Sequence, residues 1–190
     1  MTATVGRRLR IHPVSRLYPL LAFLLAACAP MIQVRSDYDT TADFARLRTY
    51  RWLQTPSNAP RDPRIDNDLI QSRVRSAVNN ELHARGYAEA TDDPDFRVTY
   101  HVMVRDKWDV QSFPVDYGYG LGHWPAANDV RLAQYEEGTL MLDVIDSASN
   151  ELIWRGSAQA RIDPNRSPQE RTELINSAVH RMLERFPPKK

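Results

Sequence analysis

The sequence predicts an α+β domain in which one antiparallel-dominated sheet carries two helices packed on one face, a two-layer sandwich. Apolar and polar residues alternate over 96–105 and again over 152–160, which is the period of a strand. Apolar residues recur at helical spacing over 65–85 and 168–186. The order is strands, helix, strands, helix, and the apolar stripes of both helices need the same Val- and Leu-rich sheet face.

The first two predicted strands are short and are followed by an irregular loop. Residues 32–38 alternate between apolar and polar types, which predicts a strand. Residues 49–53 are rich in β-forming types and place Tyr50 and Trp52 on one side, which predicts a second strand. Three prolines fall within 54–64, so we expect no regular structure there.

The first predicted helix, 65–85, has recognisable ends. Asp66 or Asn67 can cap its first turn, because a short polar side chain accepts hydrogen bonds from free backbone N–H groups. Gly86 stands where a left-handed terminator is expected. A short strand is predicted to follow at 87–90.

The strand over 96–105 leads into a predicted loop over 108–136, after which two strands over 140–145 and 152–160 are joined by a short turn. A register follows if the larger side chains share one face. In that register Val144 opposes Trp154, and the neighbouring pair is an Asp opposite an Arg at 143 and 155.

The last predicted helix has the clearest start signal. Ser167 is a preferred N-cap, Pro168 suits the first helical position, and Glu170 completes a capping box. Its predicted buried stripe consists of Leu174, Ile175, Ala178, Val179, Met182, Leu183 and Phe186. Two prolines at 187–188 end it.

The first 27 residues have the three parts of a secretory signal, so we do not expect them to belong to the folded domain. Residues 1–16 carry four arginines and no acid, and an apolar run over 17–27 ends in small residues. An apolar run of 11 residues is too short to cross a bilayer. Cleavage after it leaves a single domain of 163 residues, 28–190, whose net charge falls from +1 to −3.

The segment Leu25-Ala26-Ala27-Cys28 resembles the lipobox of bacterial lipoproteins, and Cys28 is the only cysteine of the chain. The resemblance implies that the Cys28 thiol receives a diacylglycerol and that the new amino terminus is acylated, which gives a membrane anchor. Ala29 implies an outer-membrane location by resemblance to the enterobacterial sorting rule. Because three residues separate Cys28 from the first strand-like residues and span at most ~10 Å, we expect the domain to sit against the bilayer surface.

Several runs along the mature chain resemble a bacterial lipoprotein family described as domain of unknown function 4136. They are 34–39, 42–44, 48–52, 92–96, 137–140, 151–156 and 186–188. The resemblance covers nearly the whole mature chain. It implies an envelope protein of Gram-negative bacteria and carries over no catalytic residues.

The predicted loop 108–136 is the candidate binding surface, because it combines aromatic side chains with glycines. The candidate binding residues are Trp108, Phe113, Tyr117, Tyr119, Trp124 and Tyr135. Such a surface suits an envelope protein, a peptide or a glycan. The competing interpretation is a long hairpin whose aromatic side chains fold back on the sheet edge.

The composition argues against several other functions. A formal charge of +1 provides no long-range field to attract nucleic acid, and one cysteine rules out an internal disulfide. No histidines have metal-ligand spacing, and Ser157 lies within a strand pattern instead of a nucleophile elbow. We therefore expect no cofactor, no metal and no catalytic residue. Two classes remain: a non-enzymatic binding or envelope-assembly accessory module, and a cryptic hydrolase acting on envelope polymers.

Overall fold

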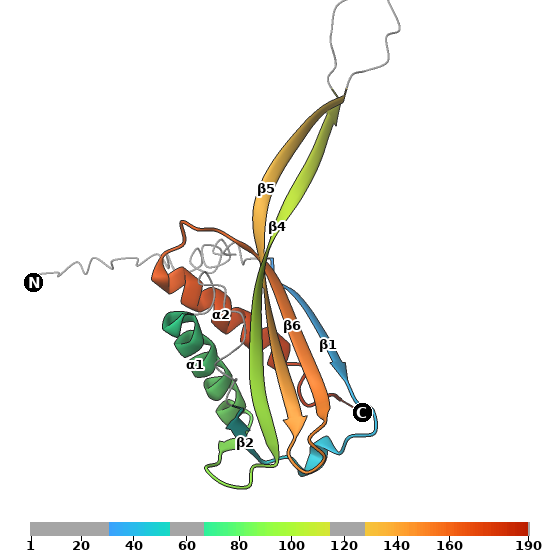
Figure 1. Ribbon diagram of the computed structural model, residues 1–190, viewed down its shortest axis with the longest axis vertical. Helices are drawn as coiled ribbons and strands as arrows, with labels where there is room; N and C mark the ends of the chain where they lie inside the picture. The colour runs from blue at the N-terminus through green and yellow to red at the C-terminus, as the bar shows by residue number, and fades with distance from the viewer. Residues whose placement is uncertain (1–30, 54–66, 115–127, 190) are drawn as a thin grey trace, which may run out of the picture.

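A computed structural model describes residues 31–53, 67–114 and 128–189, and for 111–114 and 128–131 it describes only the backbone. The elements in chain order are β1 (Gln33–Tyr38), a 3-10 turn (Phe44–Arg46), β2 (Thr49–Trp52), α1 (Asp68–Ala84), β3 (Ala88–Glu89), β4 (Phe96–Pro114), β5 (Asn128–Asp146), β6 (Leu152–Ile162) and α2 (Pro168–Leu183). Both helices cover one face of a single sheet (Figure 1). The predicted α+β class is confirmed.

The six strands lie in the order β1-β6-β5-β4-β2-β3. The β1–β6, β6–β5 and β5–β4 pairs are antiparallel, whereas β2 is parallel to β3 and β4. The predicted register is confirmed, because Val144 pairs with Trp154 and Asp143 with Arg155. The register then shifts by one residue after Val144, where a bulge leaves Ile153 unpaired with β5 and buried.

The predicted helix ends are also confirmed. The Asn67 side chain accepts from the backbone N–H of Ile70 and caps α1, and Gly86 adopts a φ of 88° just beyond it. In α2 the Ser167 side chain accepts from the N–H of Glu170, whose carboxylate accepts from the N–H of Ser167. These caps satisfy backbone groups that each helix leaves free at its start.

The core lies between the helices and the sheet and is centred on Phe186, which follows α2. The Phe186 ring lies 5.3–6.1 Å from the rings of four other aromatic residues. These are Phe44, Tyr87, Phe96 and Trp154, each from a different part of the chain. The contacts therefore join α2 to the 3-10 turn, the approach to β3, and strands β4 and β6.

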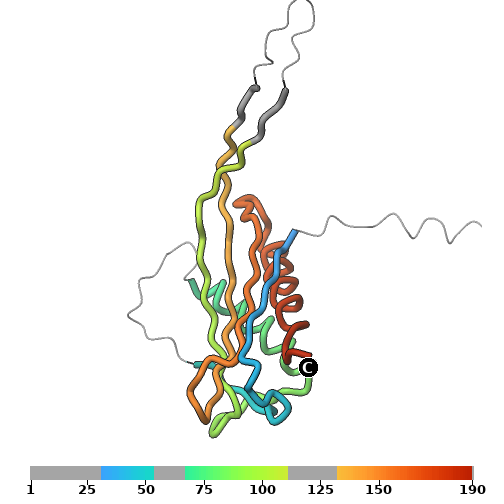
Figure 2. The backbone as a smooth tube through the Cα atoms, turned by 90° about the vertical axis from the view of Figure 1, so that its right-hand side faces the viewer, coloured from blue at the N-terminus to red at the C-terminus, as the bar shows by residue number. Residues whose placement is uncertain are grey.

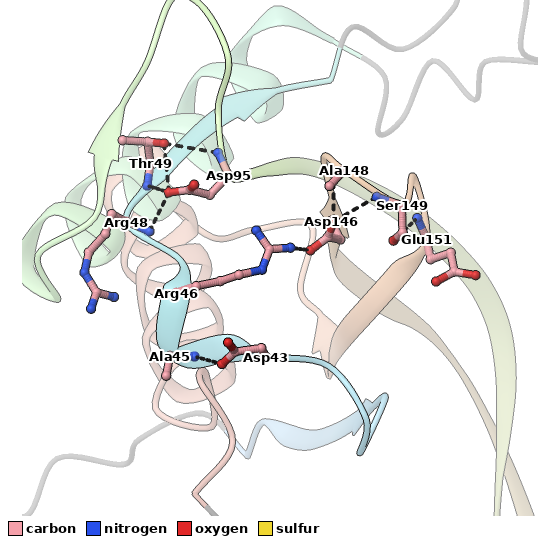
Figure 3. Close-up of polar contacts among 10 residues, drawn as sticks. All are labelled: Asp43, Ala45, Arg46, Arg48, Thr49, Asp95, Asp146, Ala148, Ser149 and Glu151. Atoms are coloured by element: carbon pink, nitrogen blue, oxygen red, sulfur yellow. Dashed lines mark hydrogen bonds and ion pairs between the residues drawn. The ribbon is translucent and has the colours of Figure 1, made fainter.

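Two carboxylates join segments at the end of the sheet where β4 begins and β5 ends (Figure 3). Asp95 accepts from the backbone N–H groups of Thr49 and Arg48, which lowers the pKa of Asp95 and fixes the start of β4 against β2. Asp146 accepts from the N–H groups of Ala148 and Ser149 in the β5–β6 turn. Asp146 also forms an ion pair with Arg46, 100 residues earlier in the chain.

The prediction of a loop over 108–136 is wrong for most of its length. β4 continues to Pro114 and β5 begins at Asn128, and they pair without interruption from Phe96↔Asp146 to Pro114↔Asn128. Beyond the Glu136↔Ile162 pair, β5 loses its β6 neighbour. The remaining ribbon, 107–114 with 128–135, is called the arm below; Figures 1 and 2 show it leaving the sheet as a twisted extension. Residues 115–127 lie outside the described residues.

Candidate functional site

One face of the arm carries an exposed apolar stripe that consists of Trp108, Val110 and Leu132. Their relative exposures are 61%, 63% and 63%. Val110 pairs directly with Leu132, and Trp108 lies two residues before Val110 on the same strand, so all three point to the same face. Large apolar side chains grouped in this way on a protruding ribbon mark a contact surface.

The opposite face of the arm base is polar and internally paired. The ammonium of Lys107 lies 2.6 Å from a carboxylate oxygen of Glu137. The Arg161 guanidinium of β6 lies 4.8 Å from the centre of the Tyr135 ring, within range of a cation–π contact. The two faces of the arm therefore differ. One carries the apolar stripe, with Gln134 opposite Trp108 and the acidic residues Asp106 and Glu136 one pair nearer the sheet. The other carries paired charges.

The structure describes only some of the candidate binding residues, and it places them on different faces of the arm. Trp108 is exposed on the apolar stripe, whereas Tyr135 is half-buried beside Arg161 on the other face. Phe113 belongs to β4, and its side chain is outside the described residues. Tyr117, Tyr119 and Trp124 also lie outside the described residues. The structure therefore places Trp108 and Tyr135 on opposite faces of one ribbon.

Sequence reasoning missed Val110 and Leu132 as members of the candidate site. The signal that could have found Val110 is the alternation of polar and apolar residues over 107–110. No such alternation marks Leu132, because residues 132–135 read Leu-Ala-Gln-Tyr. Leu132 joins the site only through the strand pairing that places it opposite Val110.

A second feature is an apolar pocket of about 350 Å³ between the sheet and the first halves of both helices. The strands contribute Val102, Val104 and Leu140, and the helices contribute Ile70, Leu174 and Ile175. The pocket lies on the same sheet face as the apolar stripe, because Val104 and Trp108 are separated by an even number of positions along β4.

Four charged residues at the pocket, Glu136, Asp163, Arg166 and Arg171, contribute two negative and two positive charges. The Arg171 guanidinium donates to the carbonyl oxygens of Arg166 and Pro164 at 3.0 and 2.8 Å, which holds the segment between β6 and α2. The pocket is therefore suited chemically to an apolar group with little net charge.

The sheet face away from the helices carries a polar cluster on β4, β5 and β6. Arg155 donates two hydrogen bonds of 2.6 Å to the buried carboxylate of Asp143, which raises the pKa of Arg155. The His101 Nε2 lies 3.8 Å from an Asp143 oxygen. Asp143 and Arg155 pair across β5 and β6, so this bidentate ion pair fixes the register of the two strands.

The described residues contain no group of three or more His, Cys, Asp or Glu side chains placed to hold a metal ion. No helix within them is both long enough and apolar enough to span a bilayer.

Comparisons with solved structures show similarity of fold. A PDZ domain protein from Parabacteroides distasonis is 10% identical, with a TM-score of 0.54 over 84% of this chain, which spans only 36% of that protein's length. A PelC dodecamer from Paraburkholderia phytofirmans is 13% identical, with a TM-score of 0.47 over 84% of this chain and 100% of that one.

Comparisons of sequence identify the family. None of the curated proteins is significantly similar to this chain. The model of the family described as domain of unknown function DUF4136 matches residues 34–188, which is nearly the whole of the predicted mature chain. The chain therefore belongs to the DUF4136 family.

Proposed function

We propose that this protein is a lipid-anchored, non-catalytic accessory module of the cell envelope that binds another envelope component through its arm. The observation that carries the proposal is the apolar stripe, which lies on a ribbon outside the core. We place the anchor at Cys28 and the domain on the periplasmic side of the outer membrane. The family and the fold are compatible with a binding module.

The arm supports this proposal because a two-stranded ribbon with no layer packed on it is only marginally stable in water. In the sheet, β4 and β5 are stabilised by packing under the helices, whereas the stripe residues Trp108, Val110 and Leu132 are mostly exposed. A ligand or partner that covers the stripe removes apolar surface from water, at roughly 25 cal/mol per Å². Binding of a ligand or partner to the stripe would therefore stabilise the arm, as expected of a contact element.

The start of the domain supports the proposed anchor. β1 begins at Gln33, five residues after Cys28. A tether of that length keeps the domain close to its site of attachment. Multiple acyl chains on one residue would provide firm attachment, whereas a single chain gives only reversible binding.

The binding half of the proposal is tested by capture from membranes of the source bacterium. Tagged full-length protein is compared with a triple variant, Trp108→Ser, Val110→Ser and Leu132→Ser. Leu69→Ser serves as the matched control, because Leu69 is equally exposed, at 66%, but lies on α1. We expect the triple variant to lose an envelope component, whether lipid, protein or glycan, that both the unaltered protein and the control retain. Equal recovery of every such component by all three proteins contradicts a role for the stripe.

The anchor half is tested separately with Cys28→Ser. We expect the unaltered protein to fractionate with membranes and its amino-terminal peptide to carry acyl chains by mass spectrometry. The Cys28→Ser protein should appear in the soluble fraction. A bare thiol at Cys28, or identical fractionation of the two proteins, contradicts the anchor.

A further inference from the structure

The register of the sheet brings the start of β1 and the base of the arm to the same end of the molecule. Gln33 pairs with Gln159, Gln159 with Thr139, and Thr139 with Met103, so Gln33 and Met103 lie at one level across four strands. From that level β4 continues into the arm, while the chain before Gln33 leads back toward Cys28. Figure 2 shows the first described residues of the chain at the end of the sheet from which the arm extends.

The two distances from this common level are matched. Cys28 lies five residues before Gln33, which places it at most about 17 Å away. Trp108 lies five residues after Met103 in a strand that rises ~3.3 Å per residue, which is also about 17 Å. Even a fully extended tether toward the arm therefore brings Cys28 only level with Trp108. Val110 and Leu132 lie one step further out.

The chemistry of the arm fits a lipid–water boundary. The stripe presents an indole and two branched aliphatic side chains on one face, and Trp is favoured at such boundaries because its ring is amphipathic. At the arm base, the opposite face carries the Lys107–Glu137 ion pair and the Arg161–Tyr135 contact. On the stripe face the acidic pair Asp106 and Glu136 lies nearer the sheet, so the apolar contact begins at Trp108 and extends outward. An amphipathic element lies along a membrane surface with its apolar part buried in the headgroup region.

The geometry points to the bilayer that holds the anchor as the surface covered by the stripe: Trp108, Val110 and Leu132 lie in its interfacial region. This inference rests on the proposed anchor at Cys28 and specifies what the base of the arm binds. The lipid and the stripe then form two attachment points, which fix the orientation of the domain on the membrane. A single flexible anchor would leave that orientation free.

The test uses the single cysteine of the chain. Once Cys28 is acylated, a cysteine introduced elsewhere is the only free thiol and takes an environment-sensitive fluorophore. Leu132→Cys places the label on the stripe. Ala133→Cys is the matched control, because it is the next residue, is also exposed and points to the opposite face. Both acylated proteins are reconstituted into vesicles of phosphatidylethanolamine and phosphatidylglycerol that contain no other protein and carry nitroxide-labelled lipid.

We expect lipid nitroxides to reduce emission at Leu132→Cys by about twofold or more and to leave emission at Ala133→Cys nearly unchanged, as burial of one face requires. If nitroxide lipids reduce emission equally at both positions, in vesicles that retain the protein on flotation, the inference is overturned and the anchor stands. Protection of Leu132→Cys only after a membrane protein extract is added also overturns it, in favour of a protein partner. Failure to float, with a bare thiol at Cys28, overturns the proposed anchor and the inference together.

Discussion

Replacement of Asp146 by Ala should be costly, because this one carboxylate joins the β5–β6 turn to the 3-10 turn near the start of the chain. Its side chain is only 9% exposed. It accepts from the backbone N–H groups of Ala148 and Ser149 at 2.9 and 3.0 Å, and it pairs with Arg46. Asp146→Ala removes all three interactions.

The magnitude follows from the surroundings of each interaction. Each backbone hydrogen bond contributes about 1 kcal/mol net, because the N–H groups of an exposed turn can bind water instead. The ion pair adds less than about 1 kcal/mol, since the Arg46 side chain is 41% exposed and its charge is screened by solvent. We therefore expect the free energy of unfolding to fall by about 2–3 kcal/mol. For a chain of this size that lowers Tm by roughly 4–12 °C.

The assay is urea denaturation of Cys28→Ser protein, with Asp43→Ala as the matched control. Asp43 also accepts from a backbone N–H, that of Ala45 at 3.1 Å, but it is exposed and makes a single such bond (Figure 3). Its replacement should cost about 0.5–1 kcal/mol. If the two variants lose the same stability within about 0.5 kcal/mol, the reasoning on Asp146 is refuted.

Three further predictions concern single residues of the fold. Gly156→Ala places a Cβ 2.5 Å from the indole ring packed over it, so the free energy of unfolding in urea should fall by about 1–3 kcal/mol. Ser167→Ala removes the capping box of α2 and should cost about 1 kcal/mol in the same assay. Backbone hydrogen bonds from Thr49 and Arg48 lower the pKa of Asp95, so its contribution to stability is full above the unfolded pKa of about 3.9 and is lost as pH falls through the lower folded pKa. Asp95→Asn should therefore make unfolding free energy less dependent on pH below about 4, as measured by urea titrations at several pH values.

Each of these predictions has a control. Gly138→Ala should cost less than Gly156→Ala, because its Cβ meets only the side chain of Ile162, at 3.1 Å. Ser167→Asp should retain the stability that Ser167→Ala loses, since Asp is an equally good N-cap. For Asp95 the control is the unaltered protein: equal dependence of the unfolding free energy on pH in the two proteins would contradict the role of Asp95.

The parts of the fold that pack against a core could be predicted from the sequence. The alternation from Phe96 to Val104 predicted a strand, and the choice of large side chains at Val144 and Trp154 predicted their pairing. In each case burial on one face imposes a pattern on the residues, and the pattern is visible without the structure. The caps of both helices were predicted for the same reason, because free N–H groups require particular side chains.

The arm could be predicted only in part, because a long hairpin was one of two interpretations of 108–136. Among the described residues no layer covers its strands, so no buried face imposes a long alternation on residues 107–114 and 128–135. Aromatic residues and glycines in the same region favoured a loop. The parallel pairing of β2 with β4 was equally hidden, since it depends on which strand is nearest in space.

The pairing of β1 with β6 has a consequence for how the molecule is made. β1 is complete once residue 38 has been synthesised, but its partner residues are 154–159. The β1 edge of the sheet therefore stays unpaired until residue 159 has been synthesised, and α2, with Phe186 just beyond it, follows later still. β1 cannot join the sheet, and Phe186 cannot complete the core, until these later segments have been synthesised. We expect the rate of this late step to be governed by contacts between distant parts of the sequence.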